Sequence, residues 1–199
     1  MFSRTILLFR LPKFIRHFTA TTTNPIPPLE LTIAIVKPHA VAQPFIVKDI
    51  ADVLIQEGFI TVRSKRIQLT KDEASEFYRD HFGRFFYQRA VELMSSGPLV
   101  VNLIAGHDAI RHWRTLMGPT KVFRSRLTHP DSLRAKFGLT DTRNAVHGSD
   151  SIASTARECK FFFPDFQMDA WYSRMEPLCR MSARNIPLNH PIPVVPEAH

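Results

Sequence analysis

The sequence predicts an α/β or α+β fold in which helices pack on a single sheet. The chain has 199 residues, and 44% of them are hydrophobic, which suits one domain with a full core and short terminal appendages. Residues 31–36 (LTIAIV) form a continuous apolar run that is typical of a buried strand. Strand-like patterns recur at 59–69 and 99–105, and helical patterns lie between them.

The helices are predicted from apolar spacing and from residues that begin or end helices. Ile46, Ile50 and Leu54 recur at helical spacing and stop before Gly58. Thr70 and Glu73 form a capping-box pattern that begins a helix reaching residue 78. Residues 84–94 and 108–117 also have helical patterns, and each ends at a Gly-Pro pair.

A short strand and one more helix are predicted after a long loop. The helix is expected to begin near Ser149, which we interpret as its N-cap, and to bury Ile152, Ala156, Cys159 and Phe163. We interpret residues 30–170 as the folded domain. Residues 171–199 form a proline-rich tail, expected to be irregular because five prolines lie within the twenty residues from Pro177.

Residues 1–29 have the composition of a mitochondrial transit peptide. They contain Arg4, Arg10, Lys13 and Arg16 and no acidic residue, and apolar residues interleave with these cations. A secretory signal needs a longer apolar run, and a basic nucleic-acid arm is a third interpretation. This segment carries four of the eight excess positive charges, so the remainder of the chain is only mildly basic.

Several function classes lack their sequence signatures. Neither a GxxxxGK[ST] nor a GxGxxG phosphate loop occurs, so a Walker-type or Rossmann nucleotide fold is not expected. No apolar run reaches the roughly 20 residues of a membrane span. The two cysteines, Cys159 and Cys179, are expected to be unpaired thiols.

Four segments contain residues suited to phosphate chemistry. Lys37 directly follows the first predicted strand, and Arg114 and Thr120 lie in RTLMGPT. Arg134 lies in a basic loop, and RNAVHGSDS contains Asn144 and His147. Each residue alone has a structural interpretation: a lysine after a strand is often solvated, and a histidine before glycine is often a turn residue.

Their combination favours a nucleotide site with a covalent carrier. Nucleotide phosphates require fixed cations and donors, which Lys37, Arg114, Thr120 and Arg134 supply. A neutral imidazole is a competent nucleophile, so His147 is suited to carry a phosphoryl group. A helix N-terminus after His147 is expected to place backbone N–H groups near that group.

These motifs together resemble the nucleoside diphosphate kinase family. The resemblance rests on IVKPHA, FYRDHFGRFF, RTLMGPT, RNAVHGSDS and Glu158, in that order, and covers residues 31–163. The details GRFFYQR and LMGPT, and a longer loop before Arg134, are similar to the divergent sixth-type (group II) branch. The resemblance implies a ferredoxin-like α/β sandwich with a four-stranded antiparallel sheet, and implies an oligomer.

The resemblance also implies a reaction and a set of site residues. The reaction is ping-pong transfer of the γ-phosphoryl of ATP or GTP to a nucleoside diphosphate, with Mg²⁺ bound through the nucleotide phosphates. His147 would be the phosphorylated nucleophile, with Glu158 holding its tautomer and Tyr78 beside it. The other roles are phosphate binding by Arg114, Thr120 and Arg134, contacts to the ribose and phosphates by Lys37 and Asn144, and stacking of Phe86 on the base.

Three positions depart from the family pattern. His39 replaces an aspartate, which we interpret as a loss of local structural support. Asp141 replaces an apolar residue at the second wall of the base site, where it is expected to weaken base binding; the alternative is a surface residue that points away from the base and pairs with Arg143 or another loop cation. The longer loop before Arg134 falls in the segment that normally packs at subunit contacts.

Two functions from different classes follow from the sequence. The first is an active nucleoside diphosphate kinase in mitochondria. The alternative is a weakly active or inactive protein of the same fold that acts through a partner in mitochondrial nucleic-acid metabolism or gene expression. A protein-histidine kinase role would use the same phosphohistidine. RNA binding by the chain alone lacks the signature of an RNA-binding domain.

Overall fold

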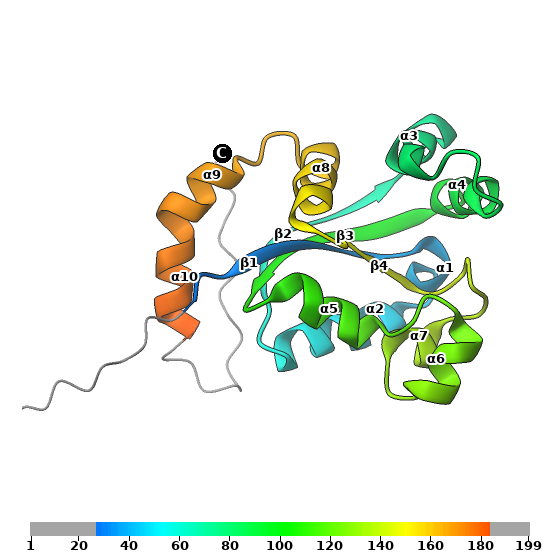
Figure 1. Ribbon diagram of the computed structural model, residues 1–199, viewed down its shortest axis with the longest axis horizontal. Helices are drawn as coiled ribbons and strands as arrows, with labels where there is room; N and C mark the ends of the chain where they lie inside the picture. The colour runs from blue at the N-terminus through cyan, green and yellow to red at the C-terminus, as the bar shows by residue number, and fades with distance from the viewer. Residues whose placement is uncertain (1–26, 184–199) are drawn as a thin grey trace, which may run out of the picture.

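The computed structural model describes residues 27–183, which form a four-stranded antiparallel sheet with helices on both faces (Figure 1). The strand order is β2-β3-β1-β4, so the two central strands are the long apolar runs of the sequence. The strands are β1 (Glu30–Val36), β2 (Ile60–Gln68), β3 (Pro98–Gly106) and β4 (Val146–Gly148). The predicted fold class is therefore confirmed. Residues 1–26 of the predicted transit segment lie outside the described residues.

The helices fill the intervals between the strands and continue after β4. They are α1 (Pro38–Val41), α2 (Pro44–Gln56), α3 (Lys71–Phe77), α4 (Tyr87–Ser95), α5 (Ala109–Met117), α6 (Val122–Thr128), α7 (Leu133–Phe137), α8 (Ile152–Phe162), α9 (Met168–Ala170) and α10 (Glu176–Ala183), with a 3-10 turn η1 (Arg79–His81) and a π-helical segment η2 (Trp171–Met175). No helix within residues 27–183 has the length and hydropathy needed to cross a membrane.

Local sequence signals explain where several helices begin. Thr70 accepts a hydrogen bond from the Glu73 backbone N–H at 3.2 Å, and the Glu73 carboxylate accepts one from the Thr70 backbone at 2.8 Å. This is the predicted capping box, which satisfies two N–H groups at the start of α3. Pro44 occupies the first position of α2, where a missing N–H costs nothing.

Alternation along the central strands divides the core into two layers. Leu31, Ile33 and Ile35 of β1 face the layer beneath α3, α4 and α8, whereas Ala34 and Val36 face the layer of α2 and α5 (Figure 1). β4 pairs with the end of β1, with His147 opposite Ile35. Because neighbouring side chains of a strand point to opposite faces, the buried Val146 directs His147 toward the layer of α3 and α8.

The segment after β3 contains more helix than the sequence predicts. Residues 118–145, expected to be a loop, contain α6 and α7 and place Arg134 on a helix. Helix α8 begins at Ile152, and its N-cap is Ser151, which accepts from the Ser154 backbone at 3.1 Å. The prediction of Ser149 as N-cap is therefore wrong.

The predicted buried face of α8 is only half right. Cys159 and Phe163 are buried, but Ile152 is 69% exposed and Ala156 is also exposed. Thr155 and Glu158 occupy the buried face in their place. The inward face of α8 is thus partly polar, because it carries a side chain that contacts His147.

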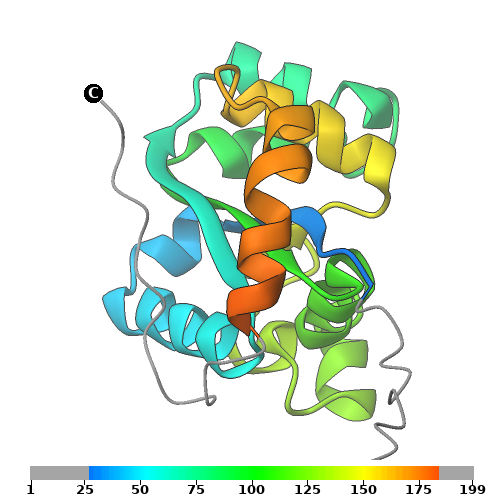
Figure 2. The same cartoon turned by 90° about the vertical axis from the view of Figure 1, so that its left-hand side faces the viewer.

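The residues up to 183 form a helical segment rather than an irregular tail. Pro177 lies in the first turn of α10 and has no backbone N–H to donate within the helix. The π-helical turn η2 directly precedes α10, and such turns are common where the hydrogen bonds of a helix are interrupted. Figure 2 shows this segment crossing the end of the sheet. Cys159 and Cys179 are both unpaired. Residues 184–199 of the predicted tail lie outside the described residues.

The C-terminal helices close the part of β1 that extends beyond β4. Three backbone N–H groups lie along this stretch: that of Leu29, which directly precedes β1, and those of Leu31 and Ile33. They donate to Glu176 Oε1 at 2.7 Å, to the Tyr172 hydroxyl at 3.2 Å and to Ser149 Oγ at 3.3 Å, respectively. Side chains therefore replace the missing strand partner along this edge, which would otherwise expose unpaired backbone groups.

Glu176→Ala is expected to destabilise the protein by about 1–3 kcal/mol, because it leaves the buried Leu29 N–H unsatisfied and removes the ion pair with Arg180. Tyr172→Phe is expected to cost about 1 kcal/mol, because it removes one partly buried hydrogen bond. Urea denaturation measures both values, with the exposed Ser173→Ala as control. Unfolding free energies equal to that of the control would show that the C-terminal helices do not secure β1.

Candidate functional site

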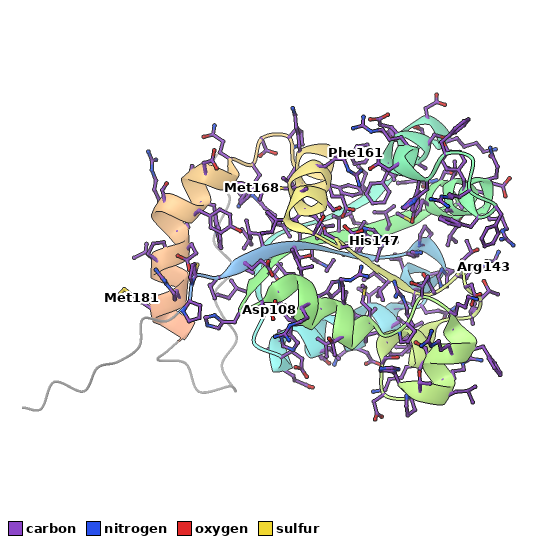
Figure 3. The ribbon with its side chains drawn as sticks, in the orientation of Figure 1. Asp108, Arg143, His147, Phe161, Met168 and Met181 are labelled. Carbon is purple, nitrogen blue, oxygen red and sulfur yellow. The ribbon has the colours of Figure 1, made fainter. Side chains whose placement is uncertain are left out.

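The site is centred on His147 in β4 and Glu158 in α8. His147 Nε2 and Glu158 Oε2 lie 3.0 Å apart, and their side chains are 21% and 4% exposed. Ser149 Oγ donates to the same carboxylate oxygen at 2.9 Å and accepts from the Ile33 backbone. The histidine is thereby linked through Glu158 of α8 and Ser149 to the central strand β1. Figure 3 shows His147 beside the sheet, on the side of α8.

The charge of Glu158 fixes which nitrogen of His147 carries the proton. Burial raises the pKa of Glu158, but the interaction with His147, the hydrogen bonds from His147 and Ser149, and nearby Arg157 outweigh it, so the pKa lies below its usual value. An ionised carboxylate only accepts hydrogen bonds, so Nε2 carries the proton. The lone pair of the neutral ring then lies on Nδ1, which is the nitrogen able to attack an electrophile.

Neighbouring groups hold the backbone and ring of His147. Trp113 Nε1 donates to the His147 carbonyl at 3.2 Å, and the Phe77 ring lies edge-on to the imidazole with centroids 5.3 Å apart. Tyr78 packs edge-on against Phe77 at 5.0 Å and is buried. Burial and the charge of Glu158 raise the pKa of Tyr78, so its hydroxyl keeps its proton.

Lys37 is buried beside the segment that leads into β4. Its ammonium donates to Asn144 Oδ1 at 2.7 Å and to the Thr142 carbonyl at 3.4 Å. Asn144 in turn donates to the Thr120 and Asp141 carbonyls. Burial, followed by the charge of Arg134, lowers the pKa of Lys37 to about 7. The sequence interpretation of Lys37 as a solvated lysine therefore does not apply.

Arg134 reaches the same region from α7. It donates to the Gly118 carbonyl at 2.7 Å and to the Val146 carbonyl at 3.4 Å, and its Nε is buried without a partner among the described residues. Burial and the charge of Arg114 lower the pKa of Arg134 to about 10. Gly118 has φ +77°, and a Cβ there would overlap Ser132 of the adjoining turn, so only glycine fits.

The cations near His147 thus repel one another. Arg134 lowers the pKa of Lys37, and Arg114 lowers that of Arg134, in both cases second to burial. Each shift would diminish if an anion bound between the cations, because opposite charge favours the protonated forms. The arrangement is therefore suited to bind a polyanion such as a nucleotide phosphate chain.

The remaining predicted residues lie on two segments that flank this region. Phe86 is half-buried at the N-cap of α4 and contacts His81 at 5.4 Å between ring centroids. Arg114 is exposed on α5, and Thr120 is exposed in the turn that precedes α6. Figure 1 shows the α3–α4 pair and the α6–α7 pair at the same end of the sheet, on opposite sides of it.

The helix that follows His147 is farther away than the sequence predicts. Four residues separate His147 from Ile152, and Ser151 already caps the first turn of α8. Its side chain also contacts Asp150 at 3.0 Å, which is itself bonded by Ser154. The N-terminus of α8 is therefore occupied by its own side chains.

His39 provides local support rather than losing it. Its Nε2 accepts a hydrogen bond from the Ala145 N–H at 3.3 Å, two residues before His147. Burial, then the charges of Lys37 and Arg143, lower its pKa to about 4, with only the Arg143 carbonyl favouring protonation. The neutral imidazole thus keeps the lone pair that the hydrogen bond requires. The interpretation of His39 as a lost support is wrong.

Asp141 helps hold the segment that contains α6 and α7. Its Oδ1 accepts from the Val122 N–H at 3.1 Å, at the first residue of α6. A carboxylate at this position satisfies an N–H that has no partner within the helix and interacts favourably with the helix dipole. The side chain thus joins the two ends of the 118–145 segment, and its predicted effect on base binding stays a prediction.

Asp141→Val is expected to weaken nucleotide binding, because it removes a cap worth about 1 kcal/mol from the segment that contains Arg134. Asp141→Asn keeps an oxygen acceptor and is expected to retain most of the affinity. Titration of a nucleoside diphosphate by calorimetry measures both constants. Tighter binding by the valine variant would support the prediction of a weakened base site.

The described residues include no group of three or more His, Cys, Asp and Glu side chains that could hold a metal ion. A cavity of about 670 Å³ borders the site on the α5 side and includes Arg114 and Asp150 in its lining, but not His147. The cavity lining also contains an imidazole, that of His129, whose Nδ1 lies 2.7 Å from the Thr128 hydroxyl, whereas the ring of His147 is bonded to the carboxylate of Glu158. The cavity places Arg114 at an open, solvated boundary of the site.

Several residues of the site have no local sequence signal. Ser149 was assigned to the wrong role, and Phe77, Trp113 and Arg157 were not predicted. Arg157 lies 3.7 Å from Glu158 and 3.4 Å from Asp80, and so connects α8 to the turn after α3. The one available clue is Glu158, a charged residue next to the apolar Cys159 on a predicted helix, and it is buried in the structure.

Comparisons with known proteins agree with this geometry. The model of the family "Nucleoside diphosphate kinase" matches residues 30–168. Nucleoside diphosphate kinase 6 of Homo sapiens is 51% identical over 152 residues, which cover 76% of this chain and 82% of that protein. The Danio rerio protein of the same name is 52% identical over 153 residues, covering 77% and 87%.

A solved structure supports the same assignment. The crystal structure of the Aquifex aeolicus nucleoside diphosphate kinase aligns with a TM-score of 0.66 and 42% identity, covering 68% of this chain and 95% of that one. The resemblance to the sixth-type branch is confirmed by the relatives at about half identity. The chain belongs to the nucleoside diphosphate kinase family.

Proposed function

We propose that this protein is an active nucleoside diphosphate kinase that transfers the γ-phosphoryl of ATP or GTP through a phosphohistidine at His147. The observation that carries the proposal is the fixed tautomer of His147, with Nε2 bonded to Glu158 at 3.0 Å and Nδ1 available for attack. Arg134 bonds the carbonyl of Val146, which directly precedes this nucleophile, and it lowers the pKa of Lys37, while Arg114 lowers that of Arg134. A histidine that served only as a turn residue would need neither a fixed tautomer nor neighbouring cations.

In the first half-reaction, Nδ1 attacks the γ-phosphorus and the bond to the bridging oxygen of the leaving diphosphate breaks. The proton stays on Nε2, which continues to donate a hydrogen bond to Glu158, and the negative charge of Glu158 stabilises the positive charge that develops on the ring. Arg114 and Arg134 offset charge on the phosphate oxygens. Tyr78, which keeps its proton, can donate a hydrogen bond beside them.

In the second half-reaction, a terminal phosphate oxygen of another diphosphate attacks the phosphorus and the N–P bond breaks. The family resemblance implies Mg²⁺, which would enter on the nucleotide and supply positive charge to the phosphates. Phe86, at the rim on α4, would stack on the base, and every base offers a π face. Such stacking fits an enzyme that accepts many bases.

The test is labelling of the full chain with γ-labelled GTP, followed by a chase with unlabelled ADP. The expected result is a label that is lost in acid, retained in alkali and recovered as ATP on the chase. Label stable to acid would contradict a phosphohistidine. Nucleotide binding without any label would favour the alternative function, in which the fold serves a protein partner.

We further propose that the protein acts in mitochondria, most simply in the matrix. The support is the composition of residues 1–29, which contain four cations and no acidic residue among interleaved apolar side chains. The family model begins at residue 30, so the segment precedes the matched domain.

A fusion of residues 1–29 to a fluorescent reporter is expected to enter mitochondria and to be cleaved there at least in part. The physical reason is that an amphipathic, acid-free cationic segment follows the membrane potential inward. Fluorescence microscopy and N-terminal sequencing of the recovered reporter measure import and cleavage. A control in which Arg4, Arg10, Lys13 and Arg16 are glutamine should stay in the cytosol, and cytosolic fluorescence of the unaltered fusion would contradict import.

A further inference from the structure

Ala145 is held at both of its backbone polar groups by one turn. Its carbonyl accepts from the Lys37 N–H at 2.8 Å, and its N–H donates to His39 Nε2 at 3.3 Å. Lys37 follows β1, and His39 is the second residue of α1. A single turn at the end of the central strand therefore fixes the residue that leads into β4.

Ala145 has a backbone conformation that needs such support. Its φ is +67°, a value that residues other than glycine rarely adopt, and the residue is completely buried. Strained residues of this kind persist where the surrounding structure determines them, and they cluster at functional sites. Ala145 precedes Val146 and His147, so its conformation sets the direction in which β4 leaves the turn.

The hydrogen bond requires a particular protonation state of His39. Nε2 can accept from the Ala145 N–H only if it carries no proton, so the neutral ring must carry its proton on Nδ1. Nδ1 is buried and has no hydrogen-bond partner among the described residues. The charged groups acting on the ring are Lys37 and Arg143, both cations, and the Arg143 carbonyl only partly offsets them.

We propose that His39 is a positioning residue for phosphoryl transfer: as a neutral imidazole protonated on Nδ1, it holds the strained Ala145 turn that presents His147. Its kinetic consequence rests on the proposed function, whereas its tautomer and its effect on the turn do not. The aspartate that the family resemblance implies at this position would be a charged hydrogen-bond acceptor. His39 supplies a neutral acceptor instead. It lies beside Lys37, whose pKa burial and the charge of Arg134 lower to about 7.

The first test reads the tautomer directly by NMR of the full chain with ¹⁵N-labelled histidine, His39 being assigned by its loss in His39→Gln. We expect a protonated Nδ1, an unprotonated Nε2, and no titration of this ring between pH 8 and 5.5. The exposed His107, in the turn after β3, serves as the internal control for the ring signals. A proton on Nε2 of His39, or titration of its ring within this pH range, would overturn the proposal without reference to activity.

The second test measures the rate of single-turnover labelling at His147 and the affinity for GDP. His39→Ala is expected to slow labelling roughly tenfold or more with little change in affinity, because small misplacement of a nucleophile is costly. His39→Gln, whose side-chain oxygen can occupy the position of Nε2, should restore most of the rate. His107→Ala should match the wild type.

The outcomes separate this proposal from the proposed function. Labelling by His39→Ala at the wild-type rate would overturn the positioning role, and so would a glutamine variant that folds but labels no faster than alanine. If the alanine variant fails to fold, the glutamine variant and the wild-type NMR spectrum decide. If the wild type is never labelled, the proposed function fails, and the tautomer of His39 still decides whether it holds the turn.

Discussion

His147→Asn is expected to abolish phosphoryl transfer, with a loss of at least about 10⁴-fold in turnover, because no covalent carrier remains and the ping-pong route is closed. In the proposed reaction Nδ1 of the imidazole is the attacking atom, because Nε2 is bonded to Glu158, and asparagine provides an amide that is not nucleophilic. A coupled assay of ATP formation from GTP and ADP measures the loss, and labelling with γ-labelled GTP should disappear with it.

Two variants distinguish lost chemistry from a damaged fold. Asparagine retains a small polar side chain at a position that is 21% exposed, so GDP affinity and unfolding free energy should change little. Glu158→Gln leaves the nucleophile in place and should cost less than His147→Asn, because it affects orientation and charge only. Label that persists in His147→Asn would show that another residue carries the phosphoryl group.

Local patterns predicted the framework of the fold well. The apolar run of β1 and the Thr70–Glu73 capping box are signals contained within a few residues, and both correspond to observed elements. Helices α6 and α7 were missed because elements of seven and five residues are too short to show a periodic apolar face. Pro177 suggested an irregular tail, yet a preceding π-helical turn accommodates it.

Features that depend on distant contacts were beyond local patterns. The bond between His39 and Ala145 joins residues 106 positions apart, and that between Leu29 and Glu176 spans 147. The apolar spacing predicts that Ile152 is buried. In the structure α8 instead turns Glu158 inward, where it contacts His147, and Ile152 faces solvent. The motifs near His147 indicated which residues to examine, whereas their mutual orientation required the folded chain.

Arg134→Ala and Arg114→Ala are each expected to slow transfer roughly 10²–10³-fold, because a fixed donor at developing charge is typically worth a few kcal/mol. The two arginines differ in their structural roles, which makes the pair informative. Arg134 is buried and bonds the Gly118 and Val146 carbonyls, so its removal should also lower the unfolding free energy. Arg114 is exposed, so its loss should leave stability within about 0.5 kcal/mol of the wild type.

Measuring kcat/KM and urea unfolding for both variants separates phosphate binding from support of the fold. Arg124→Ala, on the exposed side of α6, is the matched control and should change neither quantity appreciably. A loss of rate in Arg114→Ala at unchanged stability would assign that guanidinium to the phosphates, because Arg114 lines the cavity and acts on Arg134, whereas Arg124 is an exposed arginine outside that lining. Full turnover in both Arg114→Ala and Arg134→Ala would mean that the mutually repelling cations serve another anion, and that the phosphates of a transferring nucleotide lie elsewhere.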